Sequence, residues 1–271
     1  MLGFYVHDLN PFLIEIGNGW GIRYYGLAYV AGFLAWYYGL RWFRSKTWSN
    51  LSDHQISELL LYTVLGVLIG GRLGYCLLYD WAETVRNPIG VIAFWHGGLR
   101  GMASHGGIAG ALIGFLLWAR KSRLDGWAVA DNAAVLAPVG IFLGRIANFI
   151  NGELWGRPSQ VPWAVIFPES GTPIPRHPSQ IYEAVGEGLV LGVVMYWLRS
   201  KNLEPSGRVT GAFFMVYGGI RIVLEFFREP DLGDSLWAGF SRGQWFSVGL
   251  CLVGAGIFVW KSKLPTRVGR V

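Results

Sequence analysis

The stretch Ala128–Phe149 reads AVADNAAVLAPVGIFLGRIANF. Asp131 and Arg145 are its ionisable residues, and apolar residues fill most of the other positions. A helix needs about 20 such residues to cross the hydrocarbon core of a bilayer. This run therefore predicts a membrane-spanning helix.

Outside this stretch, six more runs are long, apolar and interrupted by few charges. They are Ile22–Trp42, Ile56–Leu78, Gly106–Trp118, Gln180–Leu198, Thr210–Phe227 and Gly243–Trp260. The third becomes long enough when it is extended to 104–120. Each run could instead be a buried helix of a soluble protein, but seven of them in 271 residues leave too little polar sequence to cover them. We therefore predict an all-α integral membrane protein whose seven-transmembrane-helix bundle forms one domain.

The composition supports this prediction and excludes several other classes of protein. Charged residues make up 15% of the chain, whereas about 25% is usual in a soluble domain. The hydrophobic fraction of 52% excludes a disordered protein. The net charge of +6 comes from scattered basic residues, which argues against nucleic acid as a partner. Two cysteines are too few for a disulfide framework or a cysteine-rich zinc site.

The basic residues predict which side of the membrane each connection faces. Thirteen of the 23 lysines and arginines lie after the first, third and fifth runs and in the C-terminal tail. Connections rich in lysine and arginine usually face the cytoplasm. We therefore expect the N-terminus outside and the C-terminus in the cytoplasm.

The longest connection, residues 151–179, falls on the outer side in this topology. It contains six prolines, which disfavour a long helix, and it is too long for a simple turn. We predict that it forms a small folded cap inserted between the fourth and fifth spans, the extracytoplasmic head of the bundle.

Several ionisable residues lie within the apolar runs, where their presence usually indicates function. Tyr217, Arg221, Glu225 and Arg228 follow a spacing that places them on one face of a helix, and Arg145 lies on the face of Asn148. Arginine matches the geometry of a phosphate group and keeps its charge in an apolar environment. The set therefore suggests a site for an anionic lipid head group.

A purely structural interpretation of these charges stays open. Arg221 could be neutralised by Glu225, and Arg145 by Glu153 or Glu187, with no role beyond packing.

His105 is the candidate general base, because two glycines follow it and could let a substrate approach. It could equally be a hydrogen-bonded residue at the start of a helix. His96 and His177 are weaker candidates. No convincing metal spacing, P-loop or G-x-S-x-G motif occurs, so we expect no metal and no cofactor. Cys76 and Cys251 lie in apolar runs without a neighbouring base and are expected to be inert.

The stretch Gly144–Gly156 reads GRIANFINGELWG and resembles the signature of the bacterial phosphatidylglycerol–prolipoprotein diacylglyceryl transferases. Further motifs of that family are similar to stretches along nearly the whole chain. These stretches are Tyr24–Leu27, Gly70–Tyr75, Arg176–Glu183, Tyr217–Arg221 and Glu225–Asp231.

The resemblance implies a seven-helix bundle with a periplasmic head in the bacterial cytoplasmic (inner) membrane. It implies transfer of the sn-1,2-diacylglyceryl group from phosphatidylglycerol to the lipobox cysteine of a prolipoprotein signal peptide, which forms a thioether and releases glycerol phosphate. The positions that the family implicates are Tyr25, His105, Arg145, Asn148, Glu153, Gly156, Tyr217, Arg221 and Glu225.

These positions receive expected roles from the resemblance and from their chemistry. His105 would be the base, and Arg145 and Arg221 would bind the phosphate. Glu153 and Glu225 would orient the two arginines. Asn148 and Tyr25 would hydrogen-bond the head group, and Gly156 and Tyr217 would also belong to the substrate site.

One stretch departs from the family pattern. The family usually has ten residues in the order W-x-G-G-M-S-x-H-G-G, whereas here the interval from Trp95 to His105 is three residues longer. The Gly-Gly pair follows His105, so the role goes to His105 and not to His96.

The main alternative is a membrane transporter of an anionic lipid or solute, with the arginines along its path. No inverted repeat or pair of broken helices supports this alternative. Accumulation of the anion in vesicles without chemical change would favour it.

Overall fold

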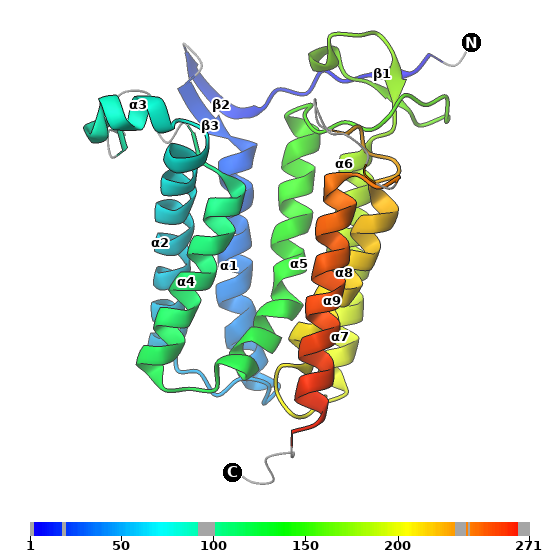
Figure 1. Cartoon of the computed structure of the whole chain (residues 1–271). Helices are drawn as coiled ribbons and strands as arrows, with labels where there is room; N and C mark the ends of the chain where they lie inside the picture. Colours follow the sequence, from blue (N-terminus) through cyan, green and yellow to red (C-terminus); the bar gives the residue numbers. More distant parts are fainter. Residues whose placement is uncertain (1–2, 18–19, 92–100, 231–236, 238, 265–271) are drawn as a thin grey trace. The chain divides into compact units, whose positions relative to one another are not determined.

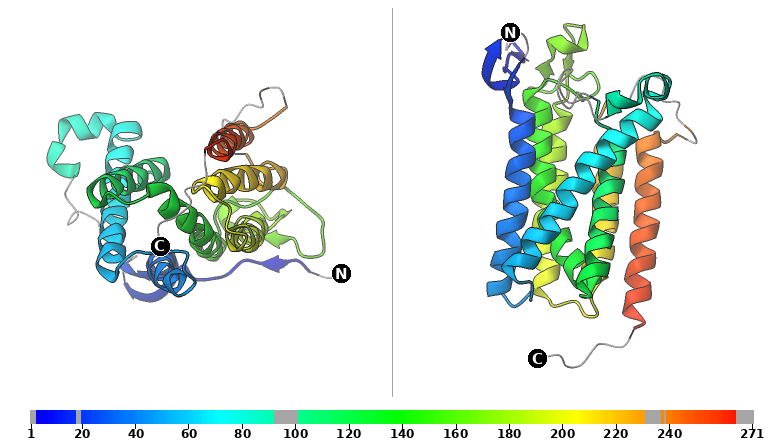
Figure 2. Two further views of the ribbon diagram at one scale, coloured as in Figure 1. Left: turned by 90° about the horizontal axis from the view of Figure 1, so that it is seen from below. Right: turned by 90° about the vertical axis from the view of Figure 1, so that its left-hand side faces the viewer.

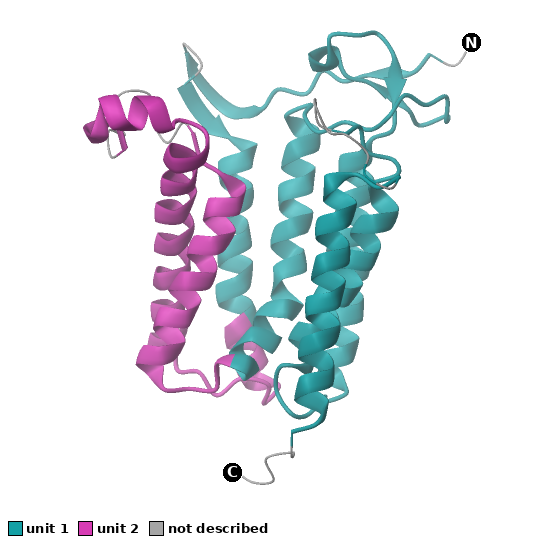
Figure 3. Ribbon diagram, in the orientation of Figure 1, with its two compact units in different colours: residues 1–39, 127–271 teal, residues 40–126 magenta. Residues whose placement is uncertain are grey.

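The computed structural model describes residues 3–17, 20–91, 101–230, 237 and 239–264, and most of these residues are helical (Figure 1). The chain forms two compact units (Figure 3). Unit 1 comprises Met1–Gly39 and Trp127–Val271, and unit 2 comprises Leu40–Gly126.

Unit 1 contains helices that run side by side (Figure 2). They are α1 (Tyr24–Ser45, whose last residues belong to unit 2), α5 (Gly126–Ile150), α6 (Ser179–Glu183), the π-helix η4 (Ala184–Val190), α7 (Leu191–Ser200), α8 (Arg208–Leu224) and α9 (Arg242–Ser262). The segments α6, η4 and α7 follow one another without a break and form one long helix, Ser179–Ser200.

Small residues bring α8 and α9 into close contact. A Cβ atom on Gly211 would lie 2.8 Å from the carbonyl oxygen of Gly254, and one on Gly254 would lie 2.6 Å from the carbonyl oxygen of Gly211. Glycine is common where membrane helices pack backbone to backbone, because no hydrophobic effect drives their association in lipid.

Unit 2 is built around the pair α2 (Asp53–Leu78) and α4 (Ser104–Ser122), with α3 (Trp81–Arg86) and the 3₁₀ helix η1 (Pro88–Val91) between them in the sequence. Glycines spaced four residues apart face each other across this pair. They are Gly66, Gly70 and Gly74 of α2 and Gly106, Gly110 and Gly114 of α4. A side chain at most of these positions would overlap the backbone of the other helix.

The connection between α5 and α6 is folded. Its strands β4 (Val165–Ile166) and β5 (Pro175–Arg176) pair antiparallel, and the 3₁₀ helix η3 (Pro168–Ser170) lies between them in sequence. The N-terminal strand β1 (Tyr5–Val6) pairs parallel with β4 and completes a three-stranded sheet. The N-terminal strand was not predicted to belong to this cap.

His7 attaches the N-terminal strand to the top of α5. Its Nε2 atom lies 2.7 Å from the carbonyl oxygen of Phe149, and its ring contacts those of Phe149 and Phe167. Phe167 is fully buried, so these rings form a small core for the cap.

A hairpin precedes the first helix. Strand β2 (Phe12–Gly17) pairs antiparallel with β3 (Trp20–Arg23), and β3 continues directly into α1. Helix α1 begins at Tyr24, two residues after the predicted start of the first span near Ile22, because Ile22 pairs with Ile14 in the hairpin. The apolar character of β3 resembles that of the helix that follows it, so hydropathy alone could not separate them.

Helices occupy most of each of the seven apolar runs. Four helical segments are long and apolar enough to cross a membrane: Asp53–Leu78, Gly126–Ile150, Ser179–Ser200 and Arg242–Ser262. The other three runs are occupied by α1, α4 and α8, of which α8 has 17 residues. The described residues thus form a mainly helical membrane protein. The short strands before α1 and in the cap are its departure from a purely helical fold.

Candidate active site

Six ionisable side chains of unit 1 meet within its helices, and we call them the arginine–glutamate cluster. They are Arg145 of α5, Glu183 of α6, Glu187 of η4, Arg221 of α8, and Glu225 and Arg228 just after α8. The three arginines and three glutamates balance in formal charge.

Arg145 binds two carboxylates through both ends of its guanidinium group. Its Nη1 lies 2.9 Å from Oε2 of Glu183, and its Nη2 lies 3.0 Å from Oε2 of Glu187. Its Nε donates a second hydrogen bond to the same Glu187 oxygen at 3.2 Å. Such a two-pronged contact fixes the plane of the guanidinium group.

Arg221 binds the other oxygens of the same two carboxylates. Its Nη1 lies 2.5 Å from Oε1 of Glu183 and 3.2 Å from Oε1 of Glu187. Its Nη2 lies 2.8 Å from Oε2 of Glu225, one helical turn further along the chain. Glu183 and Glu187 therefore each bridge Arg145 and Arg221.

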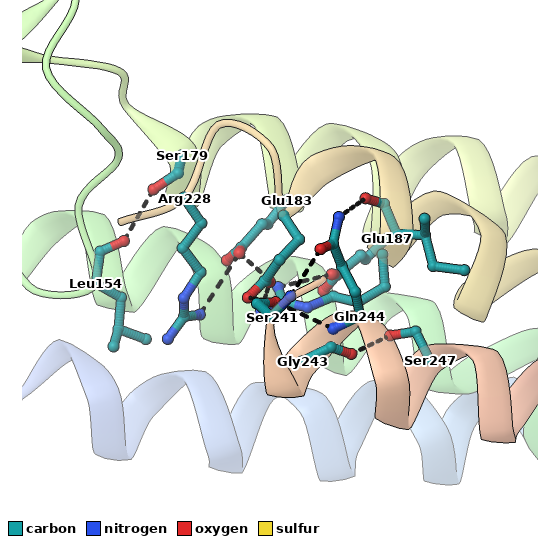
Figure 4. Close-up of polar contacts among 12 residues, drawn as sticks. Leu154, Ser179, Glu183, Glu187, Arg228, Ser241, Gly243, Gln244 and Ser247 are labelled. Atoms are coloured by element: carbon teal, nitrogen blue, oxygen red, sulfur yellow. Dashed lines mark hydrogen bonds and ion pairs between the residues drawn. The ribbon is translucent and has the colours of Figure 1, made fainter. Parts of the chain in front are cut away.

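Arg228 lies at the edge of the cluster, where its Nη1 is 3.6 Å from Oε1 of Glu183. Figure 4 shows the side chains of Arg228 and Glu183 pointing towards each other. This distance is longer than any of the ion pairs made by Arg145 and Arg221.

The two bridging glutamates are more deeply buried than the arginines they hold. The side chains of Glu183 and Glu187 are 0% exposed, whereas those of Arg145 and Arg221 are 17% and 12% exposed. Buried charges are costly unless they are paired, so the carboxylates keep the guanidinium groups in place. The accessible surface of the cluster is consequently positive.

Two glycines in η4 allow the long helix to approach its neighbours. A Cβ atom on Gly188 would lie 2.6 Å from the Cβ of Phe142 in α5, and one on Gly186 would lie 2.9 Å from a side-chain atom of Leu224 in α8. A π-helix is rare and frequently occurs at functional sites. Here it carries Glu187 between α5 and α8, where the carboxylate reaches both Arg145 and Arg221.

Residues at the start of α9 also contact Glu225. Ser241 and Gln244 form a capping box there, in which each side chain binds the backbone N–H of the other residue. The hydroxyl of Ser241 also donates a hydrogen bond to Oε1 of Glu225 at 3.1 Å. Figure 4 shows Ser241, Gly243 and Gln244 beside the bridging glutamates. Glu225 is thereby oriented towards Arg221, with which it forms an ion pair.

Glu153 has a different partner from the one expected. Its Oε1 accepts hydrogen bonds from the side-chain amides of Asn148 at 2.6 Å and Asn151 at 3.4 Å. Its carbonyl oxygen accepts one from Gln180 at 2.6 Å, which connects the cap to the start of α6. Glu153 thus orients Asn148, while Glu183 and Glu187 orient Arg145.

Gly156 lies where three backbone segments cross. Its N–H donates to the carbonyl oxygen of His177 at 2.9 Å, and it forms an isolated bridge with Arg228. A Cβ atom here would lie 2.5 Å from the carbonyl oxygens of both His177 and Phe227. Only glycine fits this crossing, which holds the backbone at Arg228 against the cap.

The two tyrosines of the predicted site also lie in unit 1. Tyr217 is one turn before Arg221 on α8, and its ring stacks on that of Phe213 with 5.9 Å between centroids. Tyr25 is the second residue of α1, and its ring centroid lies 5.4 Å from that of Tyr29.

His105 is the second residue of α4 and is exposed, and it belongs to unit 2. The expectation that the next two glycines leave room for a substrate is wrong. A side chain on Gly106 would overlap the backbone at Gly70, and one on Gly107 would contact Val67, so both glycines face α2. His96, the weaker candidate, lies outside the described residues.

Glu183 and Glu187 are the central residues that the sequence analysis left out of the predicted site. Their spacing of four residues within an apolar run was the available signal, because it puts both carboxylates on one helix face. Within the described ranges no group of three or more His, Cys, Asp or Glu residues could hold a metal ion.

Comparisons with known proteins identify close relatives. A family model described as prolipoprotein diacylglyceryl transferase matches residues 11–260. Three proteins named phosphatidylglycerol–prolipoprotein diacylglyceryl transferase are similar over nearly the full chain. The protein of Bordetella bronchiseptica is 44% identical over 96% of this chain and 98% of its own length. That of Idiomarina loihiensis is 44% identical over 95% and 96%, and that of Rhizobium meliloti is 43% identical over 90% and 87%.

Proposed function

Because this chain belongs to the prolipoprotein diacylglyceryl transferase family, we propose that its arginine–glutamate cluster binds the phosphate group of phosphatidylglycerol. The chain is a membrane transferase of lipoprotein biosynthesis. It transfers the diacylglyceryl group from phosphatidylglycerol to prolipoproteins.

The observation that carries the proposal is the position of the cluster within apolar helices. Arg145 and Glu187 lie in two of the segments that are long and apolar enough to cross a membrane. A scaffold could use apolar residues there at lower cost, because ion pairs in such surroundings lose most of their Coulomb energy to desolvation. Binding of a ligand with a phosphate group would explain why arginines occupy these positions.

The burial of the cluster indicates how the phosphate would approach. The carboxylates lie behind the guanidinium groups, so an anion would meet the accessible N–H groups of Arg145 and Arg221.

The proposed reaction is attack by the sulfur of the lipobox cysteine on the glyceryl carbon that carries the phosphate. A carbon–sulfur bond forms, the carbon–oxygen bond breaks, and the electron pair leaves with glycerol phosphate. The thiol proton goes to a base, for which His105 is the candidate. Arg145 and Arg221 stabilise the charge on the departing phosphate, and a preorganised donor of this kind contributes about 3–4 kcal/mol.

The remaining predicted residues support the cluster. Glu225 orients Arg221, and Glu153 orients Asn148 for a hydrogen bond to the head group. Tyr25 is proposed as a second hydrogen-bonding group and Tyr217 as a wall of the site beside Arg221. Gly156 contributes through the backbone, by holding Arg228 against the cap.

The proposed topology has seven spans, with the cap at 151–179 and the N-terminus outside and the C-terminus in the cytoplasm. Two features of unit 1 support it. Strand β1 and the cap share one sheet, so the N-terminus and the connection after α5 lie on the same side. The end of α9 lies at the opposite end of unit 1 (Figure 1). The membrane would be the bacterial inner membrane. The transporter alternative is not favoured.

The direct test is a mass measurement. The purified chain would be incubated with phosphatidylglycerol and a peptide that contains a lipobox cysteine. We expect the peptide to gain the mass of one diacylglyceryl unit, and a peptide with serine in place of the cysteine to gain none. Release of glycerol phosphate from the lipid without modification of the peptide would contradict the proposal that the lipobox cysteine is the acceptor.

A further inference from the structure

Arg72 of α2 is an arginine that the arginine–glutamate cluster does not use. Three of its nitrogen atoms donate to main-chain carbonyl oxygens. Nε binds Val91 at 2.9 Å, Nη2 binds Gly90 at 2.6 Å, and Nη1 binds Gly101 at 3.3 Å. Its guanidinium carbon also lies 5.9 Å from the ring centroid of Tyr75, one turn further along α2.

These carbonyls come from two different segments of unit 2. Gly90 and Val91 belong to η1, whereas Gly101 lies three residues before the start of α4. The planar fork of a guanidinium group can bind several acceptors in a fixed arrangement, which the single ammonium group of lysine cannot reproduce. Arg72 therefore joins η1 and the entry to α4 to one point on α2.

Gly101 and Ala103, which precede α4, make further contacts with α2. Gly101 has φ +77°, a conformation that favours glycine, and a side chain there would overlap the ring of Tyr75. The N–H of Ala103 then donates to the carbonyl oxygen of Gly71 at 2.9 Å, and the carbonyl oxygen of Ala103 accepts from Gly107 at 2.9 Å, which closes the first turn of α4.

His105 lies in that first turn. The glycine pairs between α2 and α4 fix the helix along its length, while the contacts of Gly71, Arg72 and Tyr75 fix the place where it begins. An exposed side chain at the second position of a helix keeps a fixed direction only while the first turn of that helix stays formed.

We propose that Arg72 is a positioning residue for the reaction, which holds the first turn of α4 and thereby the side chain of His105 in place. This inference rests on the base role proposed for His105. Arg72 acts through the backbone and does not contact the substrate, since a phosphate could engage it only by replacing the carbonyls it binds.

Hydrogen exchange tests the positioning part without any need for activity. The full-length protein would be compared with Arg72→Ala, Arg72→Lys and, as a control, Arg86→Ala, which removes an exposed arginine of the same unit. We expect faster exchange of the amides of Ala103 and Gly107, which are hydrogen-bonded at the start of α4, in Arg72→Ala, a smaller effect in Arg72→Lys, and no change in the control. Unchanged exchange at these amides would overturn the proposal.

A double-mutant cycle tests the link to His105. Misplacing a catalytic group by about 1 Å can cost about a hundredfold in rate, so kcat of Arg72→Ala should fall by that order with a smaller change in KM. If Arg72 acts through His105, adding Arg72→Ala to His105→Gln should slow the residual reaction little further. A full further loss in the double variant would overturn the proposal.

The two failures can be told apart. If His105→Gln alone retains the normal rate and pH profile, the base role of His105 fails. Faster exchange at Ala103 and Gly107 in Arg72→Ala would then show that the anchor exists but serves no base at this position, which would also overturn the positioning proposal.

Discussion

Replacing Arg221 by alanine tests whether the cluster serves the reaction or only the fold. Arg221 contacts three carboxylates, at 2.5 Å, 3.2 Å and 2.8 Å. Removing one partner of a buried ion pair usually costs about 3–5 kcal/mol of stability, because the other charge remains buried and unpaired. The loss of a preorganised donor to the phosphate costs about 3–4 kcal/mol in the transition state, or about 10²–10³ in rate.

The double variant Arg221→Ala/Glu187→Gln separates these two effects. It removes one positive and one negative charge, so the formal charge of the cluster returns to zero. Arg145 keeps Glu183 as its partner, at 2.9 Å. We expect much of the lost stability to return, because fewer carboxylates are left unpaired, while the rate stays low because the phosphate donor is still missing.

The assay combines thermal unfolding in detergent with initial rates of peptide lipidation at saturating phosphatidylglycerol. Arg120→Ala, which removes an exposed arginine of α4, is the control for the loss of any positive charge and should change neither quantity. Recovery of a near-normal rate in the double variant would refute the reasoning, because the arginine would then be needed only to neutralise buried carboxylates.

Three further predictions concern other parts of the chain. Gly110→Leu should destabilise unit 2, because the added side chain would overlap the backbone of α2; thermal unfolding should show the loss, whereas an unchanged melting temperature would contradict the packing. Asp131 accepts hydrogen bonds from the N–H of Gly207 at 2.7 Å and from Thr210 at the start of α8. Asp131→Ala should therefore lower the free energy of unfolding by about 2–3 kcal/mol, while the activity per folded molecule stays normal. Burial lowers the pKa of His177 in the cap, so the folded state favours the neutral imidazole. The stability of the cap should therefore decline as the pH falls below about 6.5, the pKa of a histidine in the unfolded chain. Hydrogen exchange of the cap at pH 7 and pH 5 measures this decline, and His177→Gln should remove the dependence on pH.

Much of the helical framework could be predicted from the sequence, because long apolar runs carry a strong signal. The start of α1 could not, since β3 is as apolar as the helix and only the pairing of Ile22 with Ile14 separates them. Strand β1 was missed for a related reason. Two residues are too short for an alternating pattern, and their partner in β4 lies far away in the sequence.

The sequence singled out Arg145, Arg221 and Glu225 but not Glu183 or Glu187, and it did not indicate most of the ion pairs of the cluster. The spacing of Arg221 and Glu225 indicated their ion pair, because both lie on one helix. The bridges through Glu183 and Glu187 depend on how three helices pack, which periodicity in a single run does not encode. The π-helix adds to this, since it shifts Glu187 away from the position that a regular α-helix would give. The glycines after His105 were expected to leave room for a substrate, whereas they face α2, because the spacing within one run does not show which helix packs against it.

We propose that the arginines of the cluster bind the phosphate of phosphatidylglycerol. The most direct measurement is an experimental structure of the chain with this lipid bound. We expect phosphate oxygens about 3 Å from the guanidinium nitrogens of Arg145 or Arg221, with Glu183 and Glu187 still in contact with these arginines. A lipid bound elsewhere, with the ion pairs of the cluster unchanged, would contradict this proposal.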